Sequence, residues 1–365
     1  MELRITHETR YDYSPAVETA QHMAHLHPLD TPCQRLLAHR LDIAPTPAQR
    51  SQTPDVYGNL RTFFSLQSPH TVLRVVAVSE VETRAPQPAP STVAWEAVRE
   101  RFRYRAGAAW DAAAEFVFAS HHAPRHDAFS AYARPSFPPG RALIEAARDL
   151  MARIHDEFTY ETFSTEVNTP ALEALERRTG VCQDFAHIMI GCLRAMGVPA
   201  RYVSGYLLTH PPAGQPRLIG SDASHAWVAV YLPDLPGAQD GNGWYDLDPT
   251  NNRSGWGSPG EDYVTLALGR DYSDISPMRG VIHGGARHTL TVAVTVQPLQ
   301  ELLSGTTPAP HEEGESGIRD AAAEPLPPLP PLPTLTPLSE LPDEHQRQTQ
   351  SRQRVLRPRR SYGPL

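Results

Sequence analysis

The stretch TGVCQDFAHIMIGCLRAMGVPARYVSGY, residues 179–206, predicts an amphipathic helix that leads into a buried strand. The helix should begin near Cys182 and end at Gly197 and Pro199, because glycine and proline terminate helices. Its apolar side chains recur at helical spacing on one face, at Phe185, Met189, Cys192, Leu193 and Met196. The strand expected from Arg201 to Leu208 follows directly. A helix that is followed by a run of strands indicates an α+β domain.

Outward from this stretch, the same patterns predict the neighbouring elements. Helices are expected before it, at residues 140–157 and 169–178. Strands are expected after it, at residues 226–232, 243–247, 262–268 and 288–296. The beginning of the chain is rich in alternating and β-branched residues, with strands expected at 36–43, 60–66 and 71–81. Antiparallel strands in which apolar and polar residues alternate predict a β-sandwich-like domain there.

These patterns divide the chain into four parts. We expect an N-terminal β domain at 1–90, a connector at 91–139, an α+β core at 140–300 and a disordered tail at 301–365. The tail contains the run PLPPLPPLP, and its last nineteen residues carry six Arg and no acidic residue. Such a segment cannot bury enough apolar surface to order itself. It is either a solvated extension or a docking segment for a partner with an aromatic groove.

Composition excludes several classes of protein. Hydrophobic residues make up 40% of the 365, which is too many for a wholly disordered chain. The formal net charge of −8 makes a nucleic-acid-binding protein an unlikely class, since such proteins are normally basic. No stretch of 18 apolar residues predicts a transmembrane segment, and the N-terminus lacks the pattern of a signal peptide. The expected location is therefore the cytoplasm.

The three cysteines, Cys33, Cys182 and Cys192, are too few and too scattered for a disulfide framework or a zinc site. Cys192 lies on the apolar face of the predicted helix and is interpreted as a core residue. Histidines cluster at His22, His25 and His27, but no Cys or carboxylate completes a usual zinc set there. Packing or surface roles are favoured for these histidines.

Cys182 is the candidate nucleophile, because it begins a helix whose free N–H groups and partial positive charge favour a thiolate. A thiolate needs a base and the base needs an orienting group. His225 heads one predicted strand, and Asp248 lies near the end of the next. Adjacent antiparallel strands can place these two side chains together on one face. Asp246 shares that face, because side chains repeat every two residues, and it competes for the third role.

Three blocks in this order carry a family resemblance: residues 179–206, then SHAWVAV at 224–230, then GWYDLDPT at 243–250. The chain resembles the transglutaminase-like superfamily, and more narrowly the bacterial transglutaminase-like cysteine proteases, over about residues 1–297. The resemblance implies a papain-like core with Cys182 as nucleophile, His225 as general base and acid, and Asp248 as orienting carboxylate. It also implies acyl transfer at an amide carbonyl of a peptide or protein, such as a glutamine side chain, without a metal or organic cofactor.

Five further residues are candidates for the surroundings of the site. Asp184 is expected mainly to favour the helix dipole, and Gln183 to contribute a backbone N–H to an oxyanion hole. Tyr160 is either a core aromatic or a phenol that donates to the oxyanion. Trp227 and Trp244 are expected to pack around the triad and shield it from water. His187, one turn into the helix, is interpreted as a helix-face residue rather than an alternative base.

The sequence favours an enzyme that hydrolyses peptide or isopeptide amides. Transamidation is the near alternative, because nothing in the residues distinguishes water from an amine as the acceptor. A non-catalytic peptide-binding module on the same fold is the second class. The presence of all three residue types of a triad argues against that module.

Overall fold

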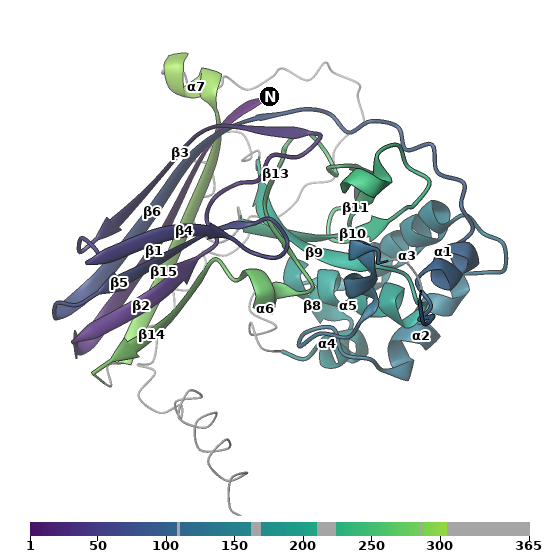
Figure 1. The fold of residues 1–365 in the computed structure, drawn as a ribbon, viewed down its shortest axis with the longest axis horizontal. Helices are drawn as coiled ribbons and strands as arrows, with labels where there is room; N and C mark the ends of the chain where they lie inside the picture. Colours follow the sequence, from purple (N-terminus) through teal and green to yellow (C-terminus); the bar gives the residue numbers. More distant parts are fainter. Residues whose placement is uncertain (108–109, 162–168, 210–223, 285–286, 305–365) are drawn as a thin grey trace, which may run out of the picture. The chain divides into compact units, whose positions relative to one another are not determined.

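The structure is a computed structural model that describes residues 1–107, 110–161, 169–209, 224–284 and 287–304, with the side chains to residue 301 (Figure 1). Residues 1–310 form one compact unit. The expectation for the tail from residue 305 onward concerns a segment outside the described residues.

A five-stranded antiparallel sheet forms the centre of the core, in the order β12–β11–β10–β9–β13. Its strands are β9 (Ala200–Leu207), β10 (Ser224–Tyr231), β11 (Trp244–Asp248), β12 (Arg253–Trp256) and β13 (Tyr263–Gly269). Strands β10 and β11 are buried on both faces, apart from Ser224, which explains the apolar run of β10 from Ala226 to Tyr231. This sheet confirms four of the predicted strands.

Helix α5 (Cys182–Ala195) packs against β10 and β9 of this sheet (Figure 1). Alternate residues of β10, at Ala226, Val228 and Val230, belong to the same buried cluster as the apolar side chains of α5. Around α5 lie three further helices: α2 (Asp127–Ala133), α3 (Leu143–Glu157) and α4 (Ala171–Arg177). The α+β core is therefore confirmed, and Cys192 lies in its interior with no exposed surface.

The segment before α5 is compact as well. Two short strands, β7 (Thr159–Tyr160) and β8 (Thr179–Gly180), pair in parallel beside the start of the helix. Three helical segments occupy the stretch expected as a connector: α1 (Trp95–Arg101), a 3-10 helix η1 (Ala112–Val117) and α2, followed by a short 3-10 turn η2 (Arg134–Ser136). Their apolar side chains, including Trp95, Val98 and Phe129, join the core cluster. This stretch thus packs as part of the core.

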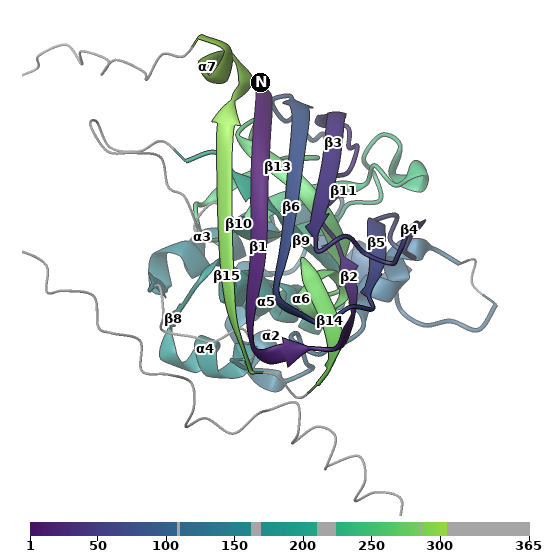
Figure 2. The same cartoon turned by 90° about the vertical axis from the view of Figure 1, so that its left-hand side faces the viewer.

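Two four-stranded antiparallel sheets form the β domain (Figure 2). One sheet has the order β15–β1–β6–β3, and contains β15 (Arg287–Pro298), β1 (Glu2–Val17), β6 (His70–Thr83) and β3 (Gln34–Ala44). The other has the order β14–β2–β5–β4, with β14 (Met278–His283), β2 (Thr19–Ala24), β5 (Leu60–Leu66) and β4 (Gln49–Pro54). Side chains from both sheets, such as Phe64 and Leu73, bury a shared core.

The sheet pairing differs from the expected domain division in one respect. Residues 278–298 were placed with the core, but β14 pairs with β2 and β15 pairs with β1 along twelve residues. The chain therefore returns from the core to complete the β domain. Alternation within 288–296 predicted the strand correctly, but a single strand's pattern does not encode which distant edge it joins.

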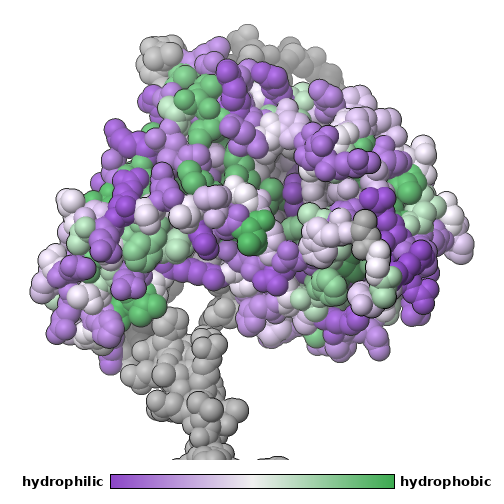
Figure 3. Space-filling view, in the orientation of Figure 1, coloured by the Kyte–Doolittle hydropathy of each residue, from purple (hydrophilic) through white to green (hydrophobic). Residues whose placement is uncertain are grey.

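Two short helices complete the described chain: α6 (Tyr272–Ile275) after β13 and α7 (Leu299–Ser304) after β15. A further 3-10 turn, η4 (Ala238–Asp240), lies in the loop between β10 and β11. The face shown in Figure 3 is predominantly hydrophilic, with hydrophobic side chains in separate patches. Among the described helices, none combines the length and apolar character that a bilayer-spanning helix requires.

Candidate active site

His225 and Asp248 come together because β10 and β11 are antiparallel neighbours. Their side chains lie on the same face of the sheet, and His225 Nε2 is 2.7 Å from Asp248 Oδ2. Asp248 has no exposed surface and His225 is 9% exposed, so the pair is shielded from solvent. The contact occupies Nε2, which leaves Nδ1 as the ring nitrogen available to a third group.

The carboxylate of Asp248 is surrounded by hydrogen-bond donors. Besides the imidazole, its Oδ2 accepts from the Tyr263 hydroxyl and from Asn251 Nδ2, each at 2.7 Å. Its Oδ1 accepts from the backbone N–H groups of Thr250 at 2.9 Å and Asn251 at 3.4 Å. Burial by itself raises the pKa of Asp248, but His225 and the Tyr263 and Asn251 donors outweigh burial and hold the pKa below its usual value. The carboxylate is therefore ionised at neutral pH.

Cys182 is half-buried at the first residue of α5 and hydrogen-bonds to the side chain of His225. Burial alone lowers the pKa of His225, yet the charge and hydrogen bond of Asp248, together with Cys182, raise it to about 10. The ring accordingly retains its second proton at neutral pH. The structure thus brings the thiol, imidazole and carboxylate into one chain of contacts.

Asp246 takes a different partner from Asp248. Its Oδ1 accepts a 2.8 Å hydrogen bond from Trp227 Nε1, and no contact with His225 is seen among the described side chains. Trp227 is fully buried, lies beside His225 with ring centroids 6.1 Å apart, and meets the Tyr263 ring edge-on at 5.5 Å. Trp227 therefore packs beside His225 and Tyr263 and donates to Asp246.

Trp244 lies elsewhere than expected. It begins β11 beside Tyr231, at the far end of the strand pair from His225, because the two strands run antiparallel. Its ring contacts Phe116 and Tyr231, with centroids 5.1 and 5.3 Å away. In the described part of the chain, no contact between Trp244 and the triad is present, so the shielding of the triad expected from Trp244 is not seen.

Asp184 stabilises the local geometry at the start of α5. Its Oδ2 accepts a 2.9 Å hydrogen bond from the backbone N–H of Val181, at the residue before the helix. A Cβ added to Gly180 would lie 2.8 Å from the Asp184 side chain, so glycine is needed at that position. The capping contact fixes the turn that presents Cys182. Gln183 follows Cys182 as the second residue of α5 and is half-buried.

Tyr160 ends the short strand β7 and is 48% exposed. Its ring meets Phe185 edge-on at 6.2 Å, which fits a peripheral aromatic of the core. His187 is buried within α5, stacks on Tyr202 at 4.9 Å, and accepts a hydrogen bond through Nε2 from the backbone N–H of Tyr272. Burial lowers the pKa of His187 to about 3, so this ring is neutral.

Tyr263 and Asn251 were missed by sequence reasoning. Asn251 follows Asp248 by three residues, and an Asn just after a strand that ends in a candidate carboxylate could have been a signal. Tyr263 lies on β13, the far edge of the sheet, and no local pattern connects it with the site. Gly205 on β9 makes the arrangement possible, because a Cβ there would lie 2.5 Å from the Trp227 ring.

The histidines near the N-terminus do not converge. His25 Nδ1 faces the carbonyl oxygen of Ser276, and His27 Nδ1 faces that of Pro28, whereas His22 is buried against Phe64. No group of three or more His, Cys, Asp or Glu side chains that could hold a metal occurs in the described ranges.

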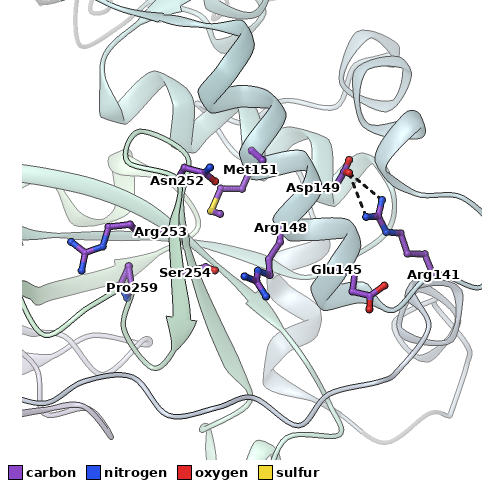
Figure 4. Close-up of a pocket in the computed structure, with 10 residues that line it drawn as sticks. Arg141, Glu145, Arg148, Asp149, Met151, Asn252, Arg253, Ser254 and Pro259 are labelled. Carbon is purple, nitrogen blue, oxygen red and sulfur yellow. Dashed lines mark hydrogen bonds and ion pairs between the residues drawn. The ribbon is translucent and has the colours of Figure 1, made fainter. Parts of the chain in front are cut away.

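A cavity of about 690 Å³ opens between α3 and β12, just beyond the turn that follows Asp248 (Figure 4). Half of its lining residues are charged: Arg141 pairs with Asp149, and Arg148 points into the cavity. None of the triad residues lines this cavity. It is therefore separate from the reacting atoms.

Comparison with known proteins identifies the family. The family model for the bacterial transglutaminase-like N-terminal region matches residues 3–82, and the model for the transglutaminase-like superfamily matches residues 130–249. An uncharacterised protein of Mycobacterium tuberculosis is 41% identical over 303 residues, which cover 81% of this chain and 93% of the relative. The chain belongs to the transglutaminase-like superfamily. Its two matched regions correspond to the β domain and the core.

Two further similarities agree with this membership. A candidate cysteine protease from Cytophaga hutchinsonii has the same fold, with a TM-score of 0.60 at 22% identity over 82% of this chain and 91% of that one. A protein-glutamine gamma-glutamyltransferase of Pseudomonas aeruginosa is 33% identical over 128 residues, which are 31% of this chain and 18% of that protein. Membership of the transglutaminase-like superfamily indicates an enzyme.

Proposed function

We propose that this protein catalyses acyl transfer at amide carbonyls of peptide or protein substrates, through a thioester on Cys182. The observation that carries the proposal is the position of His225, which contacts Cys182 on one side and the ionised carboxylate of Asp248 on the other. A generic histidine–aspartate pair has no such third group. The arrangement is that of a nucleophile, a base and an orienting group.

Each triad residue has a definite task in this proposal. His225 holds the proton of the thiol, and the resulting thiolate of Cys182 attacks the amide carbon. The tetrahedral oxyanion lies at the start of α5 in this proposal, and the backbone N–H of Gln183 is the donor that we propose for it. His225 then gives its proton to the departing nitrogen, ammonia or an amine leaves, and the thioester remains. Asp248 keeps the ring oriented and stabilises its positive charge throughout.

Hydrolysis is the outcome that we propose first, because water needs no dedicated acceptor site on the enzyme. His225 takes a proton from water, hydroxide attacks the thioester, and the carboxylic acid and Cys182 are released. Transamidation is the second candidate, supported by the similarity to the Pseudomonas gamma-glutamyltransferase. The three cysteines are free, which fits a reducing cytoplasm as the proposed location.

The decisive experiment measures the rate of Cys182 alkylation against pH by mass spectrometry, in the wild type, His225→Ala and Asp248→Ala. We expect fast labelling at and below neutral pH in the wild type and slow labelling in His225→Ala. Cys192 is the internal control, because burial raises its pKa far above the usual value and should leave it unlabelled. Labelling of Cys182 like an ordinary thiol near pH 8.5, indifferent to His225, would instead favour the binding-module alternative.

A second assay separates the two acceptors. Glutamine peptides are incubated with the enzyme, with and without a primary amine, and ammonia release and peptide mass are followed together. Hydrolysis predicts a glutamate product whether or not amine is present. Transamidation predicts that the amine is incorporated and that product formation depends on its concentration. Cys182→Ala, which leaves the rest of the core in place, is the inactive control for both ammonia release and peptide mass.

A further inference from the structure

A second cavity, of about 530 Å³, lies at the end of β10 and β11 far from His225. Alternate residues of β10 divide the sheet into two faces: Val228 and Val230 pack with α5, whereas Trp227 and Tyr231 belong to a different cluster with Phe116 and Trp244. The cavity lies on this second face. Five of its sixteen lining residues are aromatic: Tyr57, Trp110, Phe116, Tyr231 and Trp244.

Arg201 on β9 places a guanidinium group in this aromatic wall. The guanidinium carbon is 4.2 Å from the centroid of the Trp244 ring. Its Nε atom is buried without a hydrogen-bond partner, and no ion pair to Arg201 occurs among the described residues. Asp246 is the nearest acid that influences it, yet the two lie beyond ion-pair distance and Asp246 accepts instead from Trp227. Arg201 is thus a half-buried cation that stacks on Trp244 and has no ion-pair partner among the described residues.

The other charged groups at the cavity are already paired. Arg101 lies 3.0 Å from Asp111, and Glu115 accepts a 2.9 Å hydrogen bond from the Tyr57 hydroxyl. The unmet requirement of the cavity is therefore an acceptor for Arg201. The buried Nε of Arg201 lacks an acceptor, and a carboxylate matches the forked donors of a guanidinium. Aromatic walls in turn suit a planar apolar body.

We propose that this cavity binds a small ligand with an aromatic body and one carboxylate, and that the carboxylate lies against Arg201. The site is separate from the proposed catalytic centre, because five residues of β10 lie between His225 and Tyr231, which places the two about 20 Å apart at strand spacing. The proposal therefore does not depend on the acyl-transfer chemistry.

The test uses the full chain and the probe 3-phenylpropionate, with 3-phenylpropionamide as its uncharged match. Binding is followed by tryptophan fluorescence and by calorimetry. We expect saturable binding of the carboxylate and at least about tenfold weaker binding of the amide, since charge-assisted hydrogen bonds are about twice as strong as neutral ones. Equal affinity for the two probes, or displacement by the same concentration of inorganic phosphate, would overturn the proposal.

Variants locate the binding. Arg201→Met should abolish the preference for the carboxylate, and circular dichroism checks that the variant is folded. Trp110→Ala tests the same cavity without a risk to folding, because Trp110 is 78% exposed, and it should weaken binding several-fold. Arg148→Met is the matched control: this exposed arginine points into the separate cavity of Figure 4. Loss of binding in Arg148→Met, or full binding in both Arg201→Met and Trp110→Ala, would contradict the assignment.

Discussion

Two carboxylates on β11, Asp248 and Asp246, occupy equivalent positions in the sheet, but their pKa values are shifted in opposite directions. They lie two residues apart on one face, and each accepts from a ring nitrogen on β10, of His225 and Trp227 respectively. Both hydrogen bonds reach diagonally across the strand pair by the same offset. Yet the pKa of Asp248 is lowered, whereas burial raises the pKa of Asp246 to about 6. Position on the strand therefore does not decide the role of the carboxylate.

The difference lies in the donors that each carboxylate meets. Asp248 ends its strand, so the following turn supplies two backbone N–H groups and the Asn251 side chain, and β13 supplies the Tyr263 hydroxyl. Asp246 lies in mid-strand, where the backbone N–H groups are committed to the sheet, and receives one neutral indole N–H. Many donors and a cationic partner favour the charged form, and burial with few donors favours the neutral form.

The largest expected effect comes from exchanging each acid for its amide. Asp248→Asn should reduce the rate of acyl transfer by about 1,000-fold or more, because a neutral partner no longer stabilises the imidazolium or fixes its tautomer. Asp246→Asn should change the rate less than about tenfold, because Asp246 reaches His225 only through Trp227. Steady-state kinetics on one glutamine peptide measure both.

The controls for this pair are thermal unfolding and Cys182 alkylation. Both variants should be folded at the assay temperature, and Asp248→Asn should also slow alkylation at neutral pH. If the two variants lose activity equally, the distinction between the two carboxylates is wrong, and Asp246 would share the orienting role.

The second prediction concerns stability, because the two acids contribute to the free energy of unfolding over different pH ranges. The pKa of Asp246 is raised from 3.8 to about 6 in the folded chain, so the unfolded chain releases this proton first as pH rises. The stabilisation from this group is complete below about pH 4 and is lost by about pH 6. At ~1.4 kcal/mol per pKa unit, the free energy of unfolding falls by at most about 3 kcal/mol over this range. Urea unfolding of wild type and Asp246→Asn from pH 3.5 to 7 measures the difference.

Asp248 has the opposite sign and a different pH range. Its pKa is lowered in the folded chain, so its contribution is present above the usual pKa of 3.8 and is lost as pH falls below it. Asp248→Asn should therefore flatten the acid arm of the stability curve, whereas Asp246→Asn should flatten the interval between pH 4 and 6. A wild-type-like slope between pH 4 and 6 in Asp246→Asn would show that Asp246 is ionised throughout.

The same comparison shows where sequence reasoning ends. Helical spacing predicts α5 and places Cys182 at its start, because local side-chain periodicity determines both. Period two puts Asp246 and Asp248 on one face but cannot distinguish them, and the family motif was needed to choose. The contact of Tyr263 with Asp248 and the pairing partners of β14 and β15 could not be predicted, since strand partners far apart in the sequence are set by the whole sheet. Trp244 shows the converse error: proximity to the motif in sequence suggested proximity in space.

The smallest effect tests a single donor to Asp248. Tyr263→Phe removes one hydroxyl and leaves the other donors in place, so we expect a loss of about 1–2 kcal/mol in stability and threefold to tenfold in rate. The acid limb of the pH–rate profile should also move to higher pH, because the carboxylate is less stabilised. Tyr245→Phe is the control, since its hydroxyl meets the neutral Ser254 Oγ at 3.0 Å on the same sheet. Equal changes in both variants, with no movement of the acid limb, would mean that Tyr263 acts through packing rather than through the charge of Asp248.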